Sequence, residues 1–183
     1  MRYPPVSGQT IWMTGLSGAG KTTVAREFAA QLAADGVPVE ILDGDELRTN
    51  LSAGLGFSRE DRDTHVRRVG FVAELLARHG VTVVVPVIAP YADARAVVRA
   101  HHRDRGTSYR EVYVSTPLTV CQERDVKGLY ARSAAGGLSA MTGVDDPYEP
   151  PTDPDLTIDT SRVPLDDAVD ALHGLVRAES EVA

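Results

Sequence analysis

The chain has 183 residues and a formal net charge of −7, and 43% of its residues are hydrophobic. A chain of this length is most simply one domain, 1–183, and can fold without disulfide staples. Its acidic balance argues against a general nucleic-acid binder. Cys121 is the single cysteine, no apolar run could span a membrane, and the first residues lack a signal peptide's apolar core. We therefore expect a cytoplasmic protein with small-molecule ligands and with neither nucleic-acid nor membrane partners.

The first two predicted elements enclose a glycine-rich stretch. Residues 9–14 predict a buried strand, and residues 22–34 carry apolar side chains every four positions, as on one face of a helix. Between them the chain fits the phosphate-binding pattern G-x-x-x-x-G-K-[ST] at every fixed position. The residues expected to bind ATP are Gly15, Leu16, Ser17, Gly18, Ala19, Gly20, Lys21, Thr22 and Thr23. Backbone N–H groups and the helix N-terminus attract phosphates, Lys21 can reach the β- and γ-phosphates, and the Thr22 hydroxyl can ligate Mg²⁺.

The rest of the chain alternates between strand and helix patterns. Strands are predicted at 37–42, 81–88, 110–115 and 155–159, and helices at 46–50, 58–80, 92–105, from 117, and 164–178. Ser58 and Asp61 are spaced as the capping pair of the longest helix. The alternation predicts a three-layer α/β fold around a five-stranded parallel sheet. Segment 127–152 lacks a regular pattern, which favours a functional lid over a plain surface loop with a small helix.

Two carboxylates, Asp43 and Asp45, directly follow the second predicted strand. Ligands of an open parallel sheet bind beyond the carboxyl ends of its strands, so both should lie near Lys21 and Thr22. One carboxylate can hold a Mg²⁺-bound water, and the other can orient or deprotonate an acceptor hydroxyl. Alternatively, one of them only caps the next helix. The catalytic candidates are Lys21, Asp43 and Asp45, and the candidate metal ligands are Thr22 and Asp43.

Several further motifs resemble those of adenylylsulfate kinases (APS kinases), in that family's order from about residue 7 to residue 160. They are LDGD at 42–45, LGFSREDR at 55–62, RR at 67–68, IAPY at 88–91, RDVKGLY at 124–130 and TGVDDPY at 142–148. The resemblance implies a P-loop kinase fold with a mobile lid at 127–152. It implies transfer of the ATP γ-phosphoryl group to the 3′-hydroxyl of adenosine 5′-phosphosulfate (APS), giving PAPS in sulfate assimilation. It also implies Mg²⁺ as cofactor and a homodimer.

The resemblance further implies which side chains face the acceptor. They are Asp45, Arg48, Phe57, Arg62, His65, Ile88, Ala89, Lys127 and Met141. Arg48 and Arg62 can grip the phosphosulfate, because guanidinium groups bind such anions through paired hydrogen bonds. Phe57 can stack on the adenine, and Lys127 at the root of the lid can close over the phosphates.

Three of these positions depart from the family's pattern. Ala89 stands where many members have a serine that has been assigned a phosphorylated intermediate, so a reaction here must proceed without it. His65 often corresponds to Asn, and a surface or capping role is as compatible with it as a ligand role. Met141 replaces a Phe that sandwiches the acceptor base, and its flexible apolar face should stack more weakly.

All three departures concern the acceptor, so two alternatives to an APS kinase stay open. One is a kinase of the same fold that acts on another nucleotide or small hydroxyl compound. The retained Arg48, Phe57, Arg62 and Lys127 oppose it. The other is a catalytically inactive nucleotide sensor, which the intact phosphate-binding loop opposes.

Overall fold

A computed structural model describes residues 8–137 and 140–180 of the chain. Its centre is a parallel sheet of five strands in the order β2-β3-β1-β4-β5. The strands are β1 (Gln9–Thr14), β2 (Val39–Ile41), β3 (Thr82–Pro86), β4 (Ser108–Val114) and β5 (Leu156–Ile158). The helices are α1 (Lys21–Ala34), α2 (Gly44–Asn50), α3 (Arg59–Ala77), α4 (Ala92–Asp104), α5 (Leu118–Arg124), α6 (Leu129–Ala134) and α7 (Leu165–Ser180). The predicted α/β class and five-stranded parallel sheet are confirmed.

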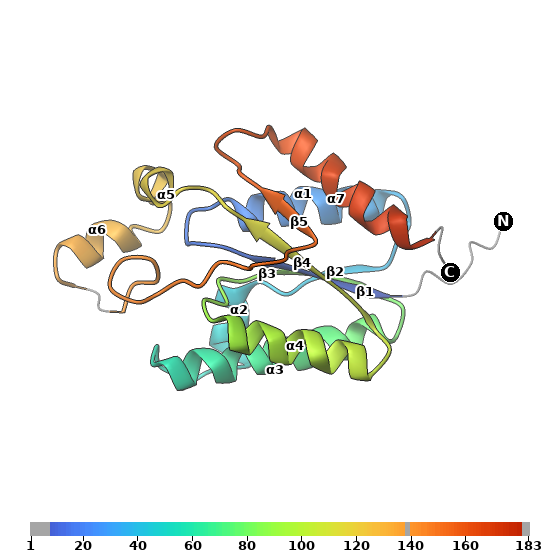
Figure 1. Cartoon of the computed structure of the whole chain (residues 1–183), viewed down its shortest axis with the longest axis horizontal. Helices are drawn as coiled ribbons and strands as arrows, with labels where there is room; N and C mark the ends of the chain where they lie inside the picture. Colours follow the sequence, from blue (N-terminus) through green and yellow to red (C-terminus); the bar gives the residue numbers. More distant parts are fainter. Residues whose placement is uncertain (1–7, 138–139, 181–183) are drawn as a thin grey trace.

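Helices cover both faces of the sheet, which gives three layers (Figure 1). Helices α1 and α7 lie on one face, and α3 and α4 lie on the other. Ile11 and Met13 of β1 join the core on the α1 side, whereas Trp12 between them joins the core on the α3 side. This alternation explains why every residue of β1 is buried, as a strand covered on both faces must be. In the described ranges, no helix has the length and apolar character needed to cross a membrane.

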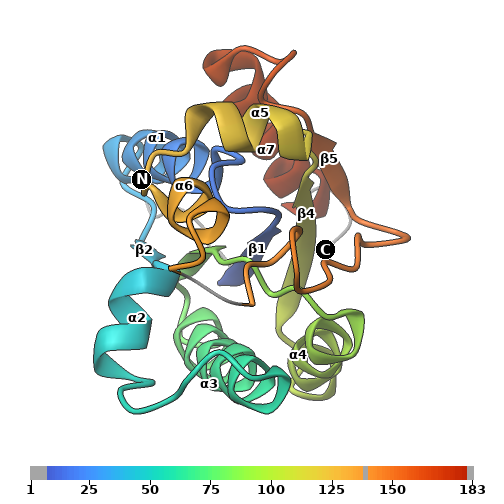
Figure 2. The same cartoon turned by 90° about the vertical axis from the view of Figure 1, so that its left-hand side faces the viewer.

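Two helices extend past the sheet at the end where the strands finish. Helices α5 and α6 lie beyond the carboxyl ends of β4 and β5, and Figure 2 looks at this end with α6 in front of the strands. Segment 127–152, predicted without regular structure, contains α6. The structure thus includes the small helix that the sequence pattern had left as an alternative.

Several predicted boundaries were wrong by a few residues. Strand β3 ends at Pro86 rather than at residue 88, because the backbone then turns and Ala89 adopts a φ of 43°. Strands β2 and β5 each have three residues, so both edges of the sheet are shorter than predicted. The turn after β3 matters for function because it brings residues 87–91 to the edge where ligands of parallel sheets bind.

At the start of α3, one of the two hydrogen bonds expected of the Ser58–Asp61 capping pair is present and the other is not. The Ser58 hydroxyl accepts a hydrogen bond from the Asp61 N–H at 3.1 Å, as predicted. The Asp61 carboxylate does not return to Ser58 but accepts from the Gly56 N–H at 3.0 Å. The carboxylate therefore fixes the glycine-rich turn before α3, and this turn carries Phe57.

Candidate active site

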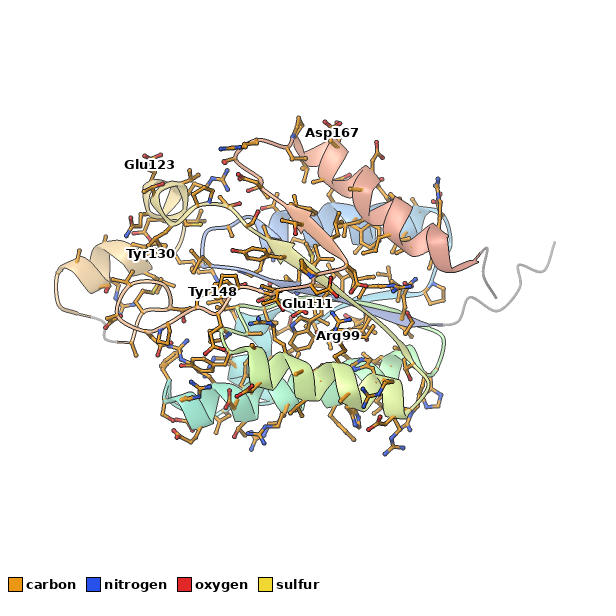
Figure 3. The ribbon with its side chains drawn as sticks, viewed as in Figure 1. Arg99, Glu111, Glu123, Tyr130, Tyr148 and Asp167 are labelled. Atoms are coloured by element: carbon orange, nitrogen blue, oxygen red, sulfur yellow. The ribbon has the colours of Figure 1, made fainter. Side chains whose placement is uncertain are left out.

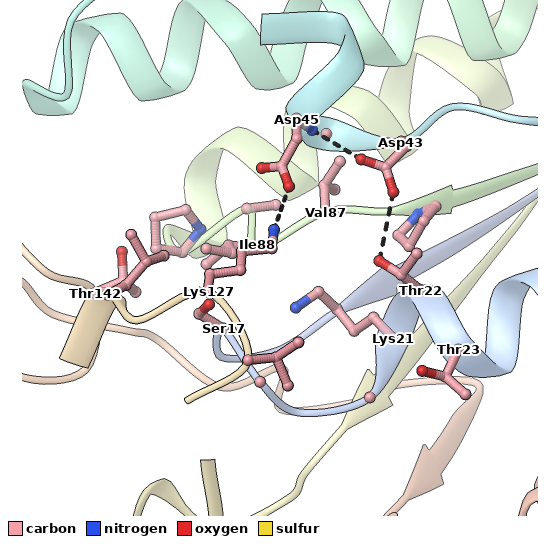
Figure 4. A pocket seen from close by; sticks show the side chains of 18 of the residues that line it. Ser17, Lys21, Thr22, Thr23, Asp43, Asp45, Val87, Ile88, Lys127 and Thr142 are labelled. Carbon is pink, nitrogen blue, oxygen red and sulfur yellow. Dashed lines mark hydrogen bonds and ion pairs between the residues drawn. The ribbon is translucent and has the colours of Figure 1, made fainter. Parts of the chain in front are cut away.

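A cleft of about 820 Å³ opens beyond the carboxyl ends of the strands. Its walls are the phosphate-binding loop, α2, the start of α3, the loop after β3 and segment 127–152 (Figure 4). Every predicted acceptor-side residue lines it, namely Asp45, Arg48, Phe57, Arg62, His65, Ile88, Ala89, Lys127 and Met141. Of the predicted ATP-binding residues, Ser17, Gly18, Gly20, Lys21, Thr22 and Thr23 line it as well. The fold therefore brings the two predicted halves of the site into one cavity.

The phosphate-binding loop is held by close backbone packing. A Cβ atom at Gly15, whose φ is 153°, would lie 2.4 Å from the Val114 carbonyl oxygen, so only glycine fits there. The buried Lys21 ammonium donates to the carbonyl oxygens of Gly15 at 2.9 Å and Leu16 at 2.8 Å. Burial, and secondarily the Lys127 charge, lower the pKa of Lys21 to about 8. A nearby polyphosphate would favour the charged ammonium, so the site suits an anion.

Asp43 caps α2 and also faces Thr22, the other candidate metal ligand. One carboxylate oxygen accepts from the Asp45 N–H at 3.0 Å and so caps α2. The other lies 3.4 Å from the Thr22 hydroxyl, which donates to it (Figure 4). In the described part of the chain, here included, no three His, Cys, Asp or Glu side chains gather as a metal site. A cation between Thr22 and Asp43 would take its other ligands from phosphate and water, which is how Mg²⁺ usually binds.

A charged pair crosses the entrance of the cleft. The Lys127 ammonium, just before α6, contacts the Asp45 carboxylate in the first turn of α2 (Figure 4). The two side chains are 50% and 72% exposed, so water screens the pair and its net contribution to stability is small. The pair can therefore open at little cost when either group is needed elsewhere.

Arg48 and Arg62 meet at the ring of Phe57. The Arg48 guanidinium lies 4.6 Å from the ring centroid and donates to the Gly56 carbonyl at 2.8 Å. The Arg62 guanidinium lies 5.7 Å from the same centroid. Burial and the Arg62 charge lower the pKa of Arg48. Phe57 is 55% exposed, so a large apolar face beside Arg48 is open to a ligand, whereas Arg62 is buried.

Arg62 also joins α3 to segment 127–152. Its guanidinium donates to the Thr142 hydroxyl at 2.7 Å and to the Ala140 carbonyl at 2.5 Å, and it lies 3.9 Å from the Asp146 carboxylate. Thr142 and Asp146 were missed as site residues, although the TGVDDPY motif that contains them had been singled out. The segment is thus tied across the cleft by a side chain predicted to bind the acceptor.

Two of the three positions that depart from the family's pattern, His65 and Met141, are buried in the wall of the cleft. The His65 Nδ1 atom lies 2.9 Å from the Ser52 hydroxyl. Burial lowers the pKa of His65 to about 4, with the charges of Arg48 and Arg68 acting in the same direction, so the imidazole is neutral near pH 7. These contacts exclude the surface or capping role that the sequence left open for His65.

Two further residues beside the phosphate-binding loop were missed. Arg124 at the end of α5 donates to the Thr160 hydroxyl at 2.8 Å, and Thr160 donates to the Ala19 carbonyl at 2.8 Å. Both line the cleft. Thr160 follows β5, and its place beyond the carboxyl end of a parallel strand was the signal that could have found it.

Comparison with known proteins agrees with this geometry. A model of the family described as adenylylsulphate kinase matches residues 7–159. The probable adenylyl-sulfate kinase of Synechocystis sp. is 54% identical over 162 residues, which cover 88% of this chain and 89% of the relative. The solved Mycobacterium tuberculosis APS kinase in complex with AMPPNP and APS has a TM-score of 0.91 and 44% identity, covering 95% of this chain and 99% of that chain. A hexameric APS kinase from Thiobacillus denitrificans has a TM-score of 0.72 and 36% identity, covering 96% of this chain and 30% of that chain.

Proposed function

The chain belongs to the adenylylsulphate kinase family of phosphotransferases, and we propose that it transfers the γ-phosphoryl group of ATP to the 3′-hydroxyl of APS, giving PAPS. The observation that carries the proposal is the shared cleft. A buried lysine at a phosphate-binding loop and a pair of arginines on an exposed aromatic ring open into the same 820 Å³ space. This arrangement suits phosphoryl transfer, whose catalysis consists mainly of positioning and charge neutralisation.

On the donor side, we assign phosphate binding to Lys21 and to the backbone N–H groups of the loop. The Lys21 ammonium would exchange its two carbonyl partners for the β- and γ-phosphates, within reach of the same side chain. Thr22 and Asp43 would hold Mg²⁺, because they present two hard oxygen atoms beside the loop. Held there, Mg²⁺ would supply positive charge that neutralises the charge developing on the transferring phosphoryl group.

On the acceptor side, we assign the phosphosulfate to Arg48 and Arg62 and the adenine to Phe57 and Met141. The pairing of two cations with one aromatic ring matches a ligand that has an anionic end and a flat base. The exposed Asp45 carboxylate would orient or deprotonate the 3′-hydroxyl after it leaves Lys127. Lys127, released in turn, can approach the phosphates.

Position 89 indicates direct transfer. Ala89 is buried in the wall of the cleft and has no hydroxyl that could carry a phosphoryl group. The acceptor hydroxyl would then attack the γ-phosphoryl group in line. Incubation with γ-labelled ATP and no acceptor should leave the protein unlabelled. Stoichiometric, chemically competent labelling of any residue would contradict direct transfer.

The proposed function is tested by ADP release coupled to a panel of acceptors, with APS first and AMP and adenosine as controls that lack the sulfate. APS should stimulate ADP release most, and the product should carry a new 3′-phosphate. If APS neither binds nor stimulates ADP release, the proposed function is wrong. The alternative is then a kinase that acts on another nucleotide or small hydroxyl compound. His65 and Met141 would then be the first residues to examine, because both line the acceptor wall.

We propose further that the whole chain, 1–183, is one domain in which segment 127–152 acts as a lid. The bonds from Arg62 to Ala140 and Thr142 support this role, since they hold the segment across the cleft. A homodimer in the cytoplasm is the assembly and location that the family resemblance favours. Size-exclusion chromatography with light scattering tests the assembly directly.

A further inference from the structure

One buried arginine outside the cleft joins three separate parts of the molecule. Arg95 lies on α4 and its side chain is 3% exposed. Its guanidinium donates to the Glu111 carboxylate on β4 at 2.8 Å, to the Ala89 carbonyl at 2.7 Å and to the Glu149 carbonyl at 2.7 Å. The three hydrogen bonds come from the three nitrogen atoms of one planar guanidinium group, an arrangement that the single ammonium group of a lysine cannot reproduce.

One of these partners, Ala89, lies in an uncommon conformation. Its φ of 43° is in the left-handed region, which is unfavourable for a residue with a side chain. Such a conformation persists only where the surroundings determine it. Here the three successive carbonyl groups of Ile88, Ala89 and Pro90 accept from Thr14 at 2.5 Å, Arg95 at 2.7 Å and Glu149 at 2.8 Å.

Another partner, Glu149, lies near the end of segment 127–152 and is bound three times to the loop after β3 and the first turn of α4. Its carbonyl accepts from Arg95, its N–H donates to the Pro90 carbonyl at 2.8 Å, and its carboxylate accepts from the Ala92 N–H at 2.7 Å. The loop after β3 and the end of segment 127–152 therefore form one unit, and Arg95 is the buried group that contacts both.

We propose that Arg95 is a positioning residue for the acceptor. It does not line the cleft, but it fixes the spacing between the Ala89 turn on one wall and the segment that carries Met141 on another. The inference rests on the proposed function, because it assigns these walls to the acceptor. ATP binding should be independent of Arg95, since the phosphate-binding loop shares none of its three bonds.

The chain offers a matched control one helical turn further along. Arg99 binds the same Glu111 carboxylate at 3.1 Å and also Asp155 at 3.3 Å, and its guanidinium lies 5.0 Å from the Tyr109 ring (Figure 3 labels Arg99 and Glu111). None of these contacts involves Ala89 or Glu149. Arg99→Lys therefore tests loss of the fork at Glu111 without loss of the bonds that join the two walls.

The first test compares the kinetics of Arg95→Lys and Arg99→Lys. Both variants keep a positive charge near Glu111, which limits the loss of stability. Arg95→Lys should raise the KM for APS about tenfold, the lower end for losing a charge-assisted hydrogen bond, and should leave the KM for ATP within about twofold. Arg99→Lys should change neither KM. Equal effects of the two variants, or a lower kcat without a higher KM for APS, would show a merely structural role and overturn the proposal.

The second test needs no substrate. Hydrogen exchange of the unliganded protein should be faster at the Ala92 and Glu149 amides in Arg95→Lys, by about tenfold or more, and unchanged in Arg99→Lys. Unaltered exchange in Arg95→Lys overturns the inference even if APS is the substrate. If wild-type protein rejects APS, the proposed function fails. The kinetic comparison is then made with the acceptor that the panel identifies. The inference about Arg95 holds only if both this comparison and the hydrogen-exchange comparison give the expected results.

Discussion

The two halves of the cleft are built in different ways. On the donor side, consecutive residues of one loop and the helix after it supply the phosphate-binding groups, and Lys21 is held by carbonyls five and six residues away. On the acceptor side, α2, α3, the loop after β3 and segment 127–152 each supply a wall. Arg62 reaches Thr142 across 80 positions of sequence. The donor half is thus fixed by local structure, whereas the acceptor half depends on tertiary contacts.

The electrostatics of the two halves differ in the same sense. Lys21 is buried, and its lowered pKa shows that the folded chain disfavours its charge. Arg62 is buried as well, but its partners Thr142 and Ala140 belong to a distant segment, and burial also lowers the pKa of the half-buried Arg48. Changes on the donor side should therefore affect transfer itself, and changes on the acceptor side should first affect acceptor binding.

The largest effect is expected from Lys21→Ala. Loss of the phosphate clamp should lower kcat by at least tenfold, or about 1.4 kcal/mol, while the fold remains intact. The folded-state pKa of about 8 lies below the ordinary lysine value of 10.5, so the free-energy penalty for burying the charge is fully present below pH 8. That penalty disappears as the pH rises from about 8 to 10.5. At pH 7 the variant should therefore melt no lower than wild type in calorimetry. A variant that keeps more than about a tenth of kcat would contradict the assignment.

The next largest effect is expected from Arg62→Ala. A charge-assisted arginine contact is worth roughly 1.5–3 kcal/mol, so the KM for APS should rise about tenfold to a hundredfold. ATP binding, measured separately by calorimetry, should barely change, because Arg62 lies on α3 and not on the phosphate-binding loop.

Thr142→Val is the control for Arg62→Ala. It removes the hydroxyl that accepts from Arg62 at 2.7 Å but keeps the guanidinium and the shape of the side chain. If the anion is held by the guanidinium, Thr142→Val should raise the KM for APS by less than about threefold, a cost below that of a typical neutral hydrogen bond. An effect equal to that of Arg62→Ala would show that Arg62 acts only through segment 127–152.

A smaller effect in the opposite direction is expected from Met141→Phe. The side chain lines the acceptor wall, and an aromatic ring there can stack on adenine with Phe57 on the other side. Aromatic pairs are worth about 0.5–1.5 kcal/mol beyond their buried area, so the KM for APS should fall about twofold to tenfold. Phe57→Ala measured in both backgrounds is the control: the gain should vanish without Phe57. An unchanged KM would mean that position 141 does not contact the base.

The same contrast explains what the sequence could predict. The glycine-rich loop between β1 and α1 and the alternation of strands and helices follow from local patterns, and the structure confirms this order of elements. The bonds from Arg62 to Thr142 and from Arg95 to Glu149 join residues 80 and 54 positions apart, so no local pattern announces them. Thr160 was missed because a single threonine after a strand carries no motif. The neutral state of His65 depends on its burial against Ser52, which only the packed structure shows.

The smallest effect is expected from His65→Asn, and it concerns stability rather than turnover. The folded-state pKa of His65, about 4, lies below the unfolded value of 6.5. The unfolded chain therefore binds a proton first, and stability that is present above pH 6.5 is lost as the pH falls toward 4. Urea unfolding at pH 7 and pH 5 should show wild type losing roughly 1 kcal/mol more than His65→Asn between the two values. His102, whose pKa is also lowered by burial, is present in both proteins, so its contribution cancels in the comparison.

The activity profile from pH 6 to 8 should have the same shape in wild type and in His65→Asn, because His65 stays neutral over that range. Equal losses of stability in the two proteins would show that His65 titrates normally and that the acceptor wall is more open to water than the donor side.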